Sequence, residues 1–228
     1  MQVSTLLYAL IAGLVPSLIW LWFWLREDTH YEPRWLIALA FIGGIVSVIF
    51  AVLIEKYIAN FDFGPNLRYT LWALTEEVAK FLAVAIIIFG AKNYDEPIDA
   101  MVYFIVVALG FSAFENALFI IQPLSGGEIA TSIITSNMRF IGATLVHIVS
   151  SASIGFALGL AFYKGYKAKI FAGIIGLLIA TTLHSAFNLS IINASGTEVL
   201  KAFAWVWGAV VILIVLFEEI KIVKPKLS

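Results

Sequence analysis

The segment Trp35–Ile54, WLIALAFIGGIVSVIFAVLI, holds twenty consecutive residues without a charge, and Ser47 is its only hydrophilic side chain. A helix rises about 1.5 Å per residue, so this length covers the roughly 30 Å hydrocarbon core of a bilayer. Seven segments of this kind predict an all-α protein, a polytopic membrane helix bundle. We expect a single integral membrane domain over residues 1–228, with spans at about 3–25, 35–54, 69–90, 98–121, 140–163, 170–192 and 199–217.

The composition excludes several classes of protein. Of the 228 residues, 62% are hydrophobic and only 13% are charged, which is incompatible with a soluble globular domain. The 14 Lys and Arg nearly balance the 15 Asp and Glu, so there is no basic surface that would indicate nucleic-acid binding. The chain has no cysteine. Any metal ligands must therefore be His, Asp, Glu or Asn.

The distribution of Lys and Arg over the connections predicts the orientation in the cell membrane. One side carries only Lys56, Arg68, Arg139 and Lys201. The side of the C-terminus carries the larger group: Arg26, Arg34, Lys92, Lys164, Lys167, Lys169, Lys221, Lys224 and Lys226. Basic residues are enriched in cytoplasmic loops, so this multi-pass protein is expected to have its N-terminus outside and its C-terminus in the cytoplasm.

Charged residues inside the predicted spans need an explanation, because each costs about 2.5–3.5 kcal/mol at the centre of a membrane helix. The third span contains Glu76, Glu77 and Lys80. Lys80 lies four residues after one glutamate and three after the other, so it can pair with either along one helix face. One carboxylate on this turn is then left without a local partner. In the fourth span, Glu115 has no local cation at all.

The polar residues of four predicted spans are expected to lie at similar depths in the membrane. Counted along helices of alternating direction, Glu76, Glu115, His147 and His184 all lie roughly 9–12 Å below the outer helix ends. Four ionisable groups at one level can converge. Asn188 lies four residues after His184 on the same helix face, where an interhelical hydrogen bond explains it as well as catalysis does. For Arg139, at a helix end, a solvated charge is the simpler interpretation.

These residue types are suited to hydrolysis, and two chemistries stay open. A Zn²⁺ held by two histidines and one carboxylate would lower the pKa of a bound water and polarise a peptide carbonyl. Without a metal, a buried glutamate could deprotonate water directly, with His or Asn stabilising the tetrahedral intermediate. Two alternatives of other classes are a proton- or ion-coupled transporter, in which the same groups relay protons, and a non-catalytic scaffold that keeps a protease-like fold.

The same residues carry a resemblance to the PrsW-type intramembrane proteases, which are related to the CAAX prenyl endopeptidases and bacteriocin-immunity proteins. Residues 76–80, EEVAK, resemble the family's Glu-Glu-x-x-Lys, and residues 110–116, GFSAFEN, resemble its Gly-Phe-x-x-x-Glu-Asn. His147 with Arg139 eight residues earlier, and residues 184–188, HSAFN, are similar to its two later motifs. The CAAX relatives carry a His where Glu115 stands, so prenylated substrates are not expected.

The resemblance implies an intramembrane endopeptidase, a hydrolase that cuts membrane proteins at or near the bilayer, with an anti-sigma factor as one kind of substrate. It implies water activation by Glu76 or Glu77, and metal binding or oxyanion stabilisation by His147 and His184. The residues that we therefore predict to be catalytic are Glu76, Glu77, Glu115, His147, His184 and Asn188. We assign structural or pKa-tuning roles to Lys80, Asn116 and Arg139, and the ligands of a zinc ion are predicted to be Glu115, His147 and His184.

Overall fold

The computed structural model describes residues 3–28, 30–192 and 194–224. Within these residues the chain is helical and contains no strand. The helices are α1 (Val3–Glu27), α2 (Arg34–Ile58), α3 (Pro65–Ile87), α4 (Pro97–Ser125), α5 (Ile129–Met138), a π-helix (Arg139–Ala143), α6 (Thr144–Leu160), α7 (Tyr166–Ile191) and α8 (Thr197–Lys221). The expected all-α bundle is confirmed, and each of the seven expected ranges falls on a helix.

Six helical segments of the described chain are long and apolar enough to cross a membrane, and one of them is the continuous stretch Ile129–Leu160. α3 is not among these six although it has 23 residues. The reason is its content of charged side chains, since it carries Arg68 in addition to Glu76, Glu77 and Lys80. The protein is a multi-pass membrane protein in which the least apolar long helix brings the most charge into the bundle.

The helix α5 lies in a segment that the sequence analysis leaves as a connection. It is only ten residues long and contains Ser, Thr and Asn, which lower its hydropathy. These side chains bond back to their own helix: the Ser132 hydroxyl donates to the Glu128 carbonyl and the Asn137 amide to the Ile133 carbonyl. Two polar side chains of the segment are therefore satisfied within it, and the chain continues through the π-helix into α6.

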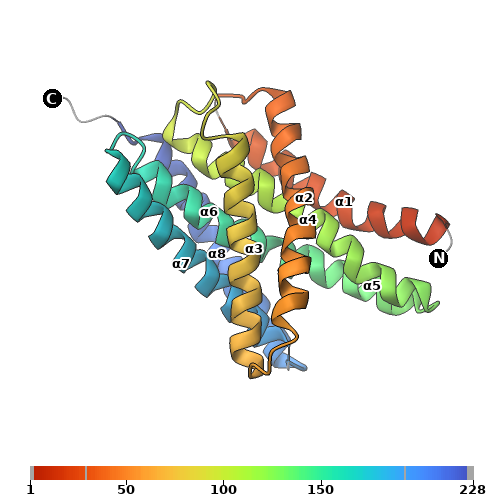
Figure 1. Ribbon diagram of the computed structural model, residues 1–228. Helices are drawn as coiled ribbons and strands as arrows, with labels where there is room; N and C mark the ends of the chain where they lie inside the picture. Colours follow the sequence, from red (N-terminus) through yellow and green to blue (C-terminus); the bar gives the residue numbers. More distant parts are fainter. Residues whose placement is uncertain (1–2, 29, 193, 225–228) are drawn as a thin grey trace.

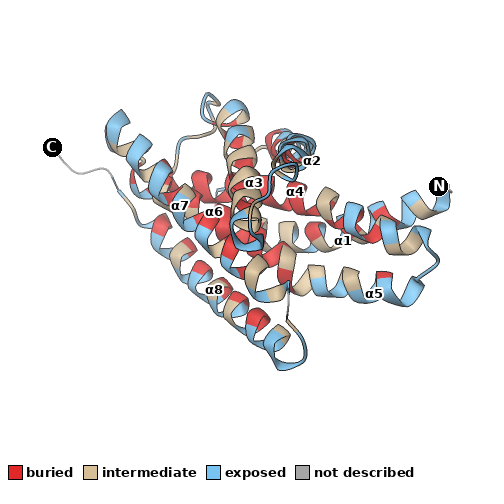
Figure 2. Cartoon of the chain, turned by 60° about the horizontal axis from the view of Figure 1, so that its bottom comes forward, coloured by how far each residue is buried: buried red, intermediate tan, exposed pale blue. Residues whose placement is uncertain are grey.

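Figure 1 shows α2 and α3 as a pair, with α6, α7 and α8 on one side and α1 and α5 extending to the other. α4 passes through the middle and packs against α1, α2 and α6. Its first seventeen residues are all buried, and Figure 2 shows the buried residues concentrated on α4 and α6. A helix that is apolar all round is buried either in lipid or inside a protein, and the contacts of α4 with its neighbours place it inside the bundle. α4 is thus the central helix of the bundle, against which α1, α2 and α6 pack.

α2 crosses α4 at a point where both helices have glycine. A Cβ on Gly110 would overlap the Phe41 carbonyl oxygen, and a Cβ on Gly44 would overlap the carbonyl oxygen of Val107. Small residues let membrane helices approach closely, and here they bring the two backbones into contact. One turn or more beyond this crossing, α2 packs against both α3 and α4, in a cluster made of Val48, Ala51, Val52, Ala79, Phe111 and Phe114.

Candidate active site

The polar residues of the four central helices meet in one buried cluster. α3 supplies Glu76, Glu77 and Lys80, α4 supplies Glu115 and Asn116, α6 supplies His147, and α7 supplies His184. Their meeting agrees with the similar depths that the sequence predicts for Glu76, Glu115, His147 and His184. The two imidazole rings pack edge to face with their centroids 4.8 Å apart, and the Phe111 ring lies 5.3 Å from that of His147.

Glu77 is the carboxylate to which Lys80 is bonded. The Lys80 ammonium donates to Oε1 of Glu77 over 2.6 Å, and both side chains are fully buried. Nδ1 of His184 lies 2.9 Å from the same oxygen, and the Ser151 hydroxyl donates to Oε2 over 2.8 Å. Both oxygens of Glu77 are therefore occupied by protein donors. Lys80 is thus paired with Glu77, three residues before it, and not with Glu76, four residues before it.

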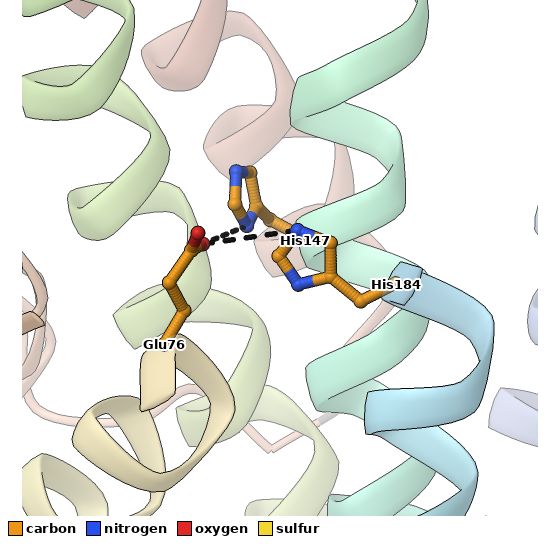
Figure 3. A group of neighbouring side chains, drawn as sticks. All are labelled: Glu76, His147 and His184. Carbon is orange, nitrogen blue, oxygen red and sulfur yellow. Dashed lines mark ion pairs between the residues drawn. The ribbon is translucent and has the colours of Figure 1, made fainter. Parts of the chain in front are cut away.

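Glu76 has the opposite environment. Its Oε2 is buried and has no hydrogen-bond partner among the described residues. This oxygen lies 3.8 Å from Nδ1 of His147 and 3.7 Å from Nε2 of His184, and Figure 3 shows the carboxylate directed at the two rings. One oxygen and two nitrogens, all within 4.8 Å of one another, face a common point. A buried carboxylate oxygen without a donor is costly unless a proton or a cation completes it.

Each histidine is oriented by a carboxylate on its far nitrogen. His147 has Nε2 at 2.8 Å from Oε2 of Glu115, and His184 has Nδ1 on Glu77. When a carboxylate accepts the N–H of an imidazole, the other ring nitrogen keeps its lone pair, and both of these nitrogens are directed at Glu76. Histidines that ligate metals are held in this way. Nδ1 of His147 is also 2.9 Å from the Lys80 ammonium, which donates to it.

Arg139 corrects one interpretation of the sequence, because it is not a solvated charge at a helix end. It begins the π-helix, and only 14% of its side chain is exposed. Nη2 donates to Oε2 of Glu115 and Nε donates to Oδ1 of Asn116, each over 2.5 Å. The guanidinium also lies 4.0 Å from the centroid of the Phe119 ring. The signal for this pairing was in the sequence, since Glu115 lacked a local cation and Arg139 was otherwise uncommitted.

Asn116 and Asn188, the two asparagines that the sequence singled out, differ in their contacts. The Asn116 amide donates to the hydroxyls of Ser112 and Thr144, at 3.2 and 3.0 Å, so it ties α4 to α6 next to the cluster. The Asn188 side chain is half-buried, and the described part of the chain gives it no hydrogen bond. The contacts thus connect Asn116, but not Asn188, to the charged cluster.

Glu55 of α2 is a member of the cluster that the sequence analysis missed. Its carboxyl is near enough to interact electrostatically with Glu76, Glu115 and Lys80. It was missed because it follows directly on the predicted span 35–54, where a charge is expected to face the membrane surface. Its spacing on α2 would have revealed it, because Val48, Ala51, Val52 and Glu55 lie on one helix face.

The donor set of the cluster fits a divalent metal ion. Two imidazole nitrogens and one carboxylate oxygen form a ligand set that leaves a position open for water in catalytic zinc sites. The groups that converge are Glu76, His147 and His184, whereas Glu115, the ligand predicted from the sequence, is engaged with Arg139 and with the far nitrogen of His147. Around the three ligands, four carboxylates face only two basic side chains. The acidic side chains thus outnumber the basic ones around the three groups, which favours a cation at this position.

Comparison with known proteins agrees with these features. The model of a family described as PrsW family intramembrane metalloprotease matches residues 32–217. The chain is 29% identical to "Protease PrsW" of Oceanobacillus iheyensis over 187 residues, which is 80% of this chain and 82% of that protein. It is 26% identical to "Protease PrsW" of Bacillus subtilis with the same coverage, and 25% identical to that of Clostridioides difficile, covering 78% of this chain and 76% of the relative. No solved structure matches the chain.

Proposed function

The chain belongs to the PrsW family of intramembrane metalloproteases, and from this membership we propose that Glu76, His147 and His184 form its peptidase site and hold a divalent metal ion. The protein is an intramembrane endopeptidase, and its family does not favour the transporter and scaffold alternatives. The observation that carries the proposed site is the unpartnered Oε2 of Glu76, which faces one nitrogen from each histidine. Zinc is the ion that this ligand set suits best.

A zinc ion held there would lower the pKa of a water molecule towards neutrality and polarise the carbonyl of the scissile peptide bond. The protein's own contribution is orientation. Glu77 and Glu115 accept the N–H groups of His184 and His147, so the opposite ring nitrogens keep their lone pairs directed at the reacting centre. Both oxygens of Glu77 accept hydrogen bonds from the protein, so Glu77 is not free to act as a base. We therefore assign the contact with the metal ion, or with the reacting water, to Glu76.

Lys80 has two roles in this proposal. Its ammonium neutralises Glu77 inside the membrane, and it donates to Nδ1 of His147, the nitrogen that we assign as a ligand. Lys80 and a metal ion therefore compete for this nitrogen. In the chain without metal, Lys80 holds His147 in place. An ion held at this nitrogen would take the place of the Lys80 bond to His147, and the ammonium would still have Glu77 as its partner.

The substrate is a membrane protein, as the family implies, and the site requires an extended stretch of its backbone. A helical substrate must unwind locally before its carbonyl can approach Glu76, because a helix keeps its carbonyls in its own hydrogen bonds. We propose an anti-sigma factor as the first substrate to test, on the strength of the family resemblance. The excess of Lys and Arg near the C-terminal side supports an N-terminus outside and a C-terminus in the cytoplasm.

The proposed site is tested by metal content. The wild-type chain, Glu76→Gln, His147→Ala and His184→Ala are purified in detergent and analysed by elemental mass spectrometry. Glu198→Gln is the matched control, because Glu198 is an exposed carboxylate on α8. We expect about one zinc per chain in the wild type and in the control, and loss in the three site variants. Zinc retained by all three variants would contradict the assignment of the ligands. A wild type without metal would leave Glu76 as the base that activates water directly.

A further inference from the structure

Ser151 lies on α6 one turn after His147, so α6 presents an imidazole and a hydroxyl on one face. The Ser151 side chain is fully buried, and its hydroxyl donates to Oε2 of Glu77 on α3 over 2.8 Å. Close packing fixes α6 near this position, because a Cβ on Gly155, one turn further along, would lie 2.6 Å from the Ala100 carbonyl oxygen of α4. The hydroxyl is therefore held at a defined distance from α3.

The bond made by Ser151 differs from the usual one for a serine inside a helix. Such a hydroxyl commonly donates to a carbonyl of its own helix, three or four residues earlier. Five helical serines of the described chain do this, namely Ser17, Ser47, Ser132, Ser153 and Ser190. Ser150 is as buried as Ser151, but its hydroxyl has no hydrogen-bond partner among the described residues, and it lines a pocket with Leu183 and Trp205. The bond from Ser151 to Glu77 is thus a specific contact between two helices.

Three helices hold the Glu77 carboxylate, and each contributes one contact. The Lys80 ammonium from α3 and Nδ1 of His184 from α7 both lie at Oε1, at 2.6 and 2.9 Å. Within the described residues, Oε2 is bonded by Ser151 alone. Without this hydroxyl, Oε2 would be a buried acceptor without a donor, which is costly. The carboxylate would regain a donor by turning until Lys80 bridges its two oxygens, and this turn moves Oε1 away from His184.

We propose that Ser151 is a positioning residue of the peptidase site, which holds the Glu77 carboxylate in the orientation that directs Nε2 of His184 at Glu76. That nitrogen lies 3.7 Å from Oε2 of Glu76, and the ring is oriented by the bond of its other nitrogen to Glu77. Removing a group that orients a metal ligand weakens metal binding by about 10- to 100-fold. Ser151 acts through Glu77, so its effect belongs at the lower end of this range. The inference rests on the proposed function, because it assigns Ser151 to the same site.

The test compares Ser151→Ala with Ser150→Ala, which removes the same hydroxyl from the preceding and equally buried residue. Zinc affinity is measured by chelator competition on the metal-stripped full chain in detergent. We expect Ser151→Ala to bind zinc about tenfold more weakly than the wild type, Ser150→Ala to bind it equally well, and Ser151→Thr, which keeps a hydroxyl, to recover most of the loss. Wild-type affinity in Ser151→Ala would overturn the proposal. So would equal losses at the two serines, or equal losses in Ser151→Ala and Ser151→Thr.

A second measurement, on the metal-free chain, separates this inference from the proposed function. The chain has three histidines, so isotope-labelled histidine gives few ring signals in NMR, and those of His184 are identified by their absence in His184→Ala. We expect the His184 ring signals to shift in Ser151→Ala and to keep their wild-type positions in Ser150→Ala. Unshifted signals in Ser151→Ala would refute the positioning role even if zinc binds. A wild type that binds no zinc would refute the metal site of the proposed function, and the His184 signals would still decide the role of Ser151.

Discussion

Glu76→Gln and Glu77→Gln make the same chemical change on adjacent residues, and the structure predicts very different losses of stability. Glu77 accepts from Lys80, Ser151 and His184, and it shares full burial with Lys80. Neutralising it leaves a buried ammonium without its bonded counter-charge. Breaking a buried ion pair by removing one partner costs about 3–5 kcal/mol. Glu76 has an oxygen without a hydrogen-bond partner among the described residues, so Glu76→Gln removes a buried charge that is not paired. We expect the free energy of unfolding of this variant to lie within about 1 kcal/mol of the wild-type value.

Both variants are expected to lose peptidase activity, so stability is the measurement that separates them. Unfolding is followed by denaturant titration in detergent, with cleavage assayed on the same preparations. The double variant Glu77→Gln/Lys80→Met removes both charges and is expected to recover most of the lost stability without recovering activity. Equal stability of the two single variants would refute the division of roles between Glu76 and Glu77. So would a double variant that is less stable than Glu77→Gln.

Three further predictions concern residues around the site and at the ends of the bundle. Arg139→Leu removes the guanidinium bonds to Glu115 and Asn116, and we expect cleavage to fall at least about tenfold, with partial recovery in Arg139→Lys, because an ammonium replaces only one of the two contacts. Gly110→Ala places a methyl group against the Phe41 carbonyl and is expected to destabilise the bundle by about 1–3 kcal/mol in thermal unfolding, whereas Gly64→Ala, where nothing lies within 4 Å, has little effect. Burial raises the pKa of Asp28, which lies in the connection between α1 and α2, so this carboxyl contributes stability below its ordinary pKa of about 4 and loses it as the pH rises through the folded value. Asp28→Asn should therefore raise the melting temperature at pH 7 and flatten its dependence on pH above about 4, and an unchanged dependence would contradict this origin.

The convergence of Glu76, Glu115, His147 and His184 could be predicted because it needs only two quantities. The positions of the helix ends follow from hydropathy, and the rise per residue is a constant, so depth can be counted along each helix. Which residues share a depth is then fixed, and polar residues at one depth have few partners other than each other. The buried position of these groups in the bundle follows from the same reasoning.

The contacts of Arg139 and Glu55 could not be predicted in this way, and both lie at the limits of hydropathy windows. A charge at such a limit is ordinarily assigned to the membrane surface. In this chain Arg139 begins the π-helix and donates to Glu115 and Asn116, and Glu55 continues the face of α2 that packs against α3 and α4. The choice of Lys80 between Glu76 and Glu77 was equally open, because a lysine reaches a carboxylate at either spacing. It was decided by Ser151 and His184, whose positions depend on how α6 and α7 pack.

The imbalance of charge in the cluster distinguishes a binding site from a structural ion-pair network. A network that serves only to hold helices together in a membrane is most stable when each carboxylate has its own basic partner, because an unpaired charge costs several kcal/mol there. Glu77 with Lys80 and Glu115 with Arg139 satisfy this condition. Glu76 does not, and its Oε2 faces one nitrogen of each histidine without a hydrogen-bond partner among the described residues. The part of the cluster that is poorly explained by stability is therefore the part where a cation and a water molecule would be held, and this is the position that a peptidase requires.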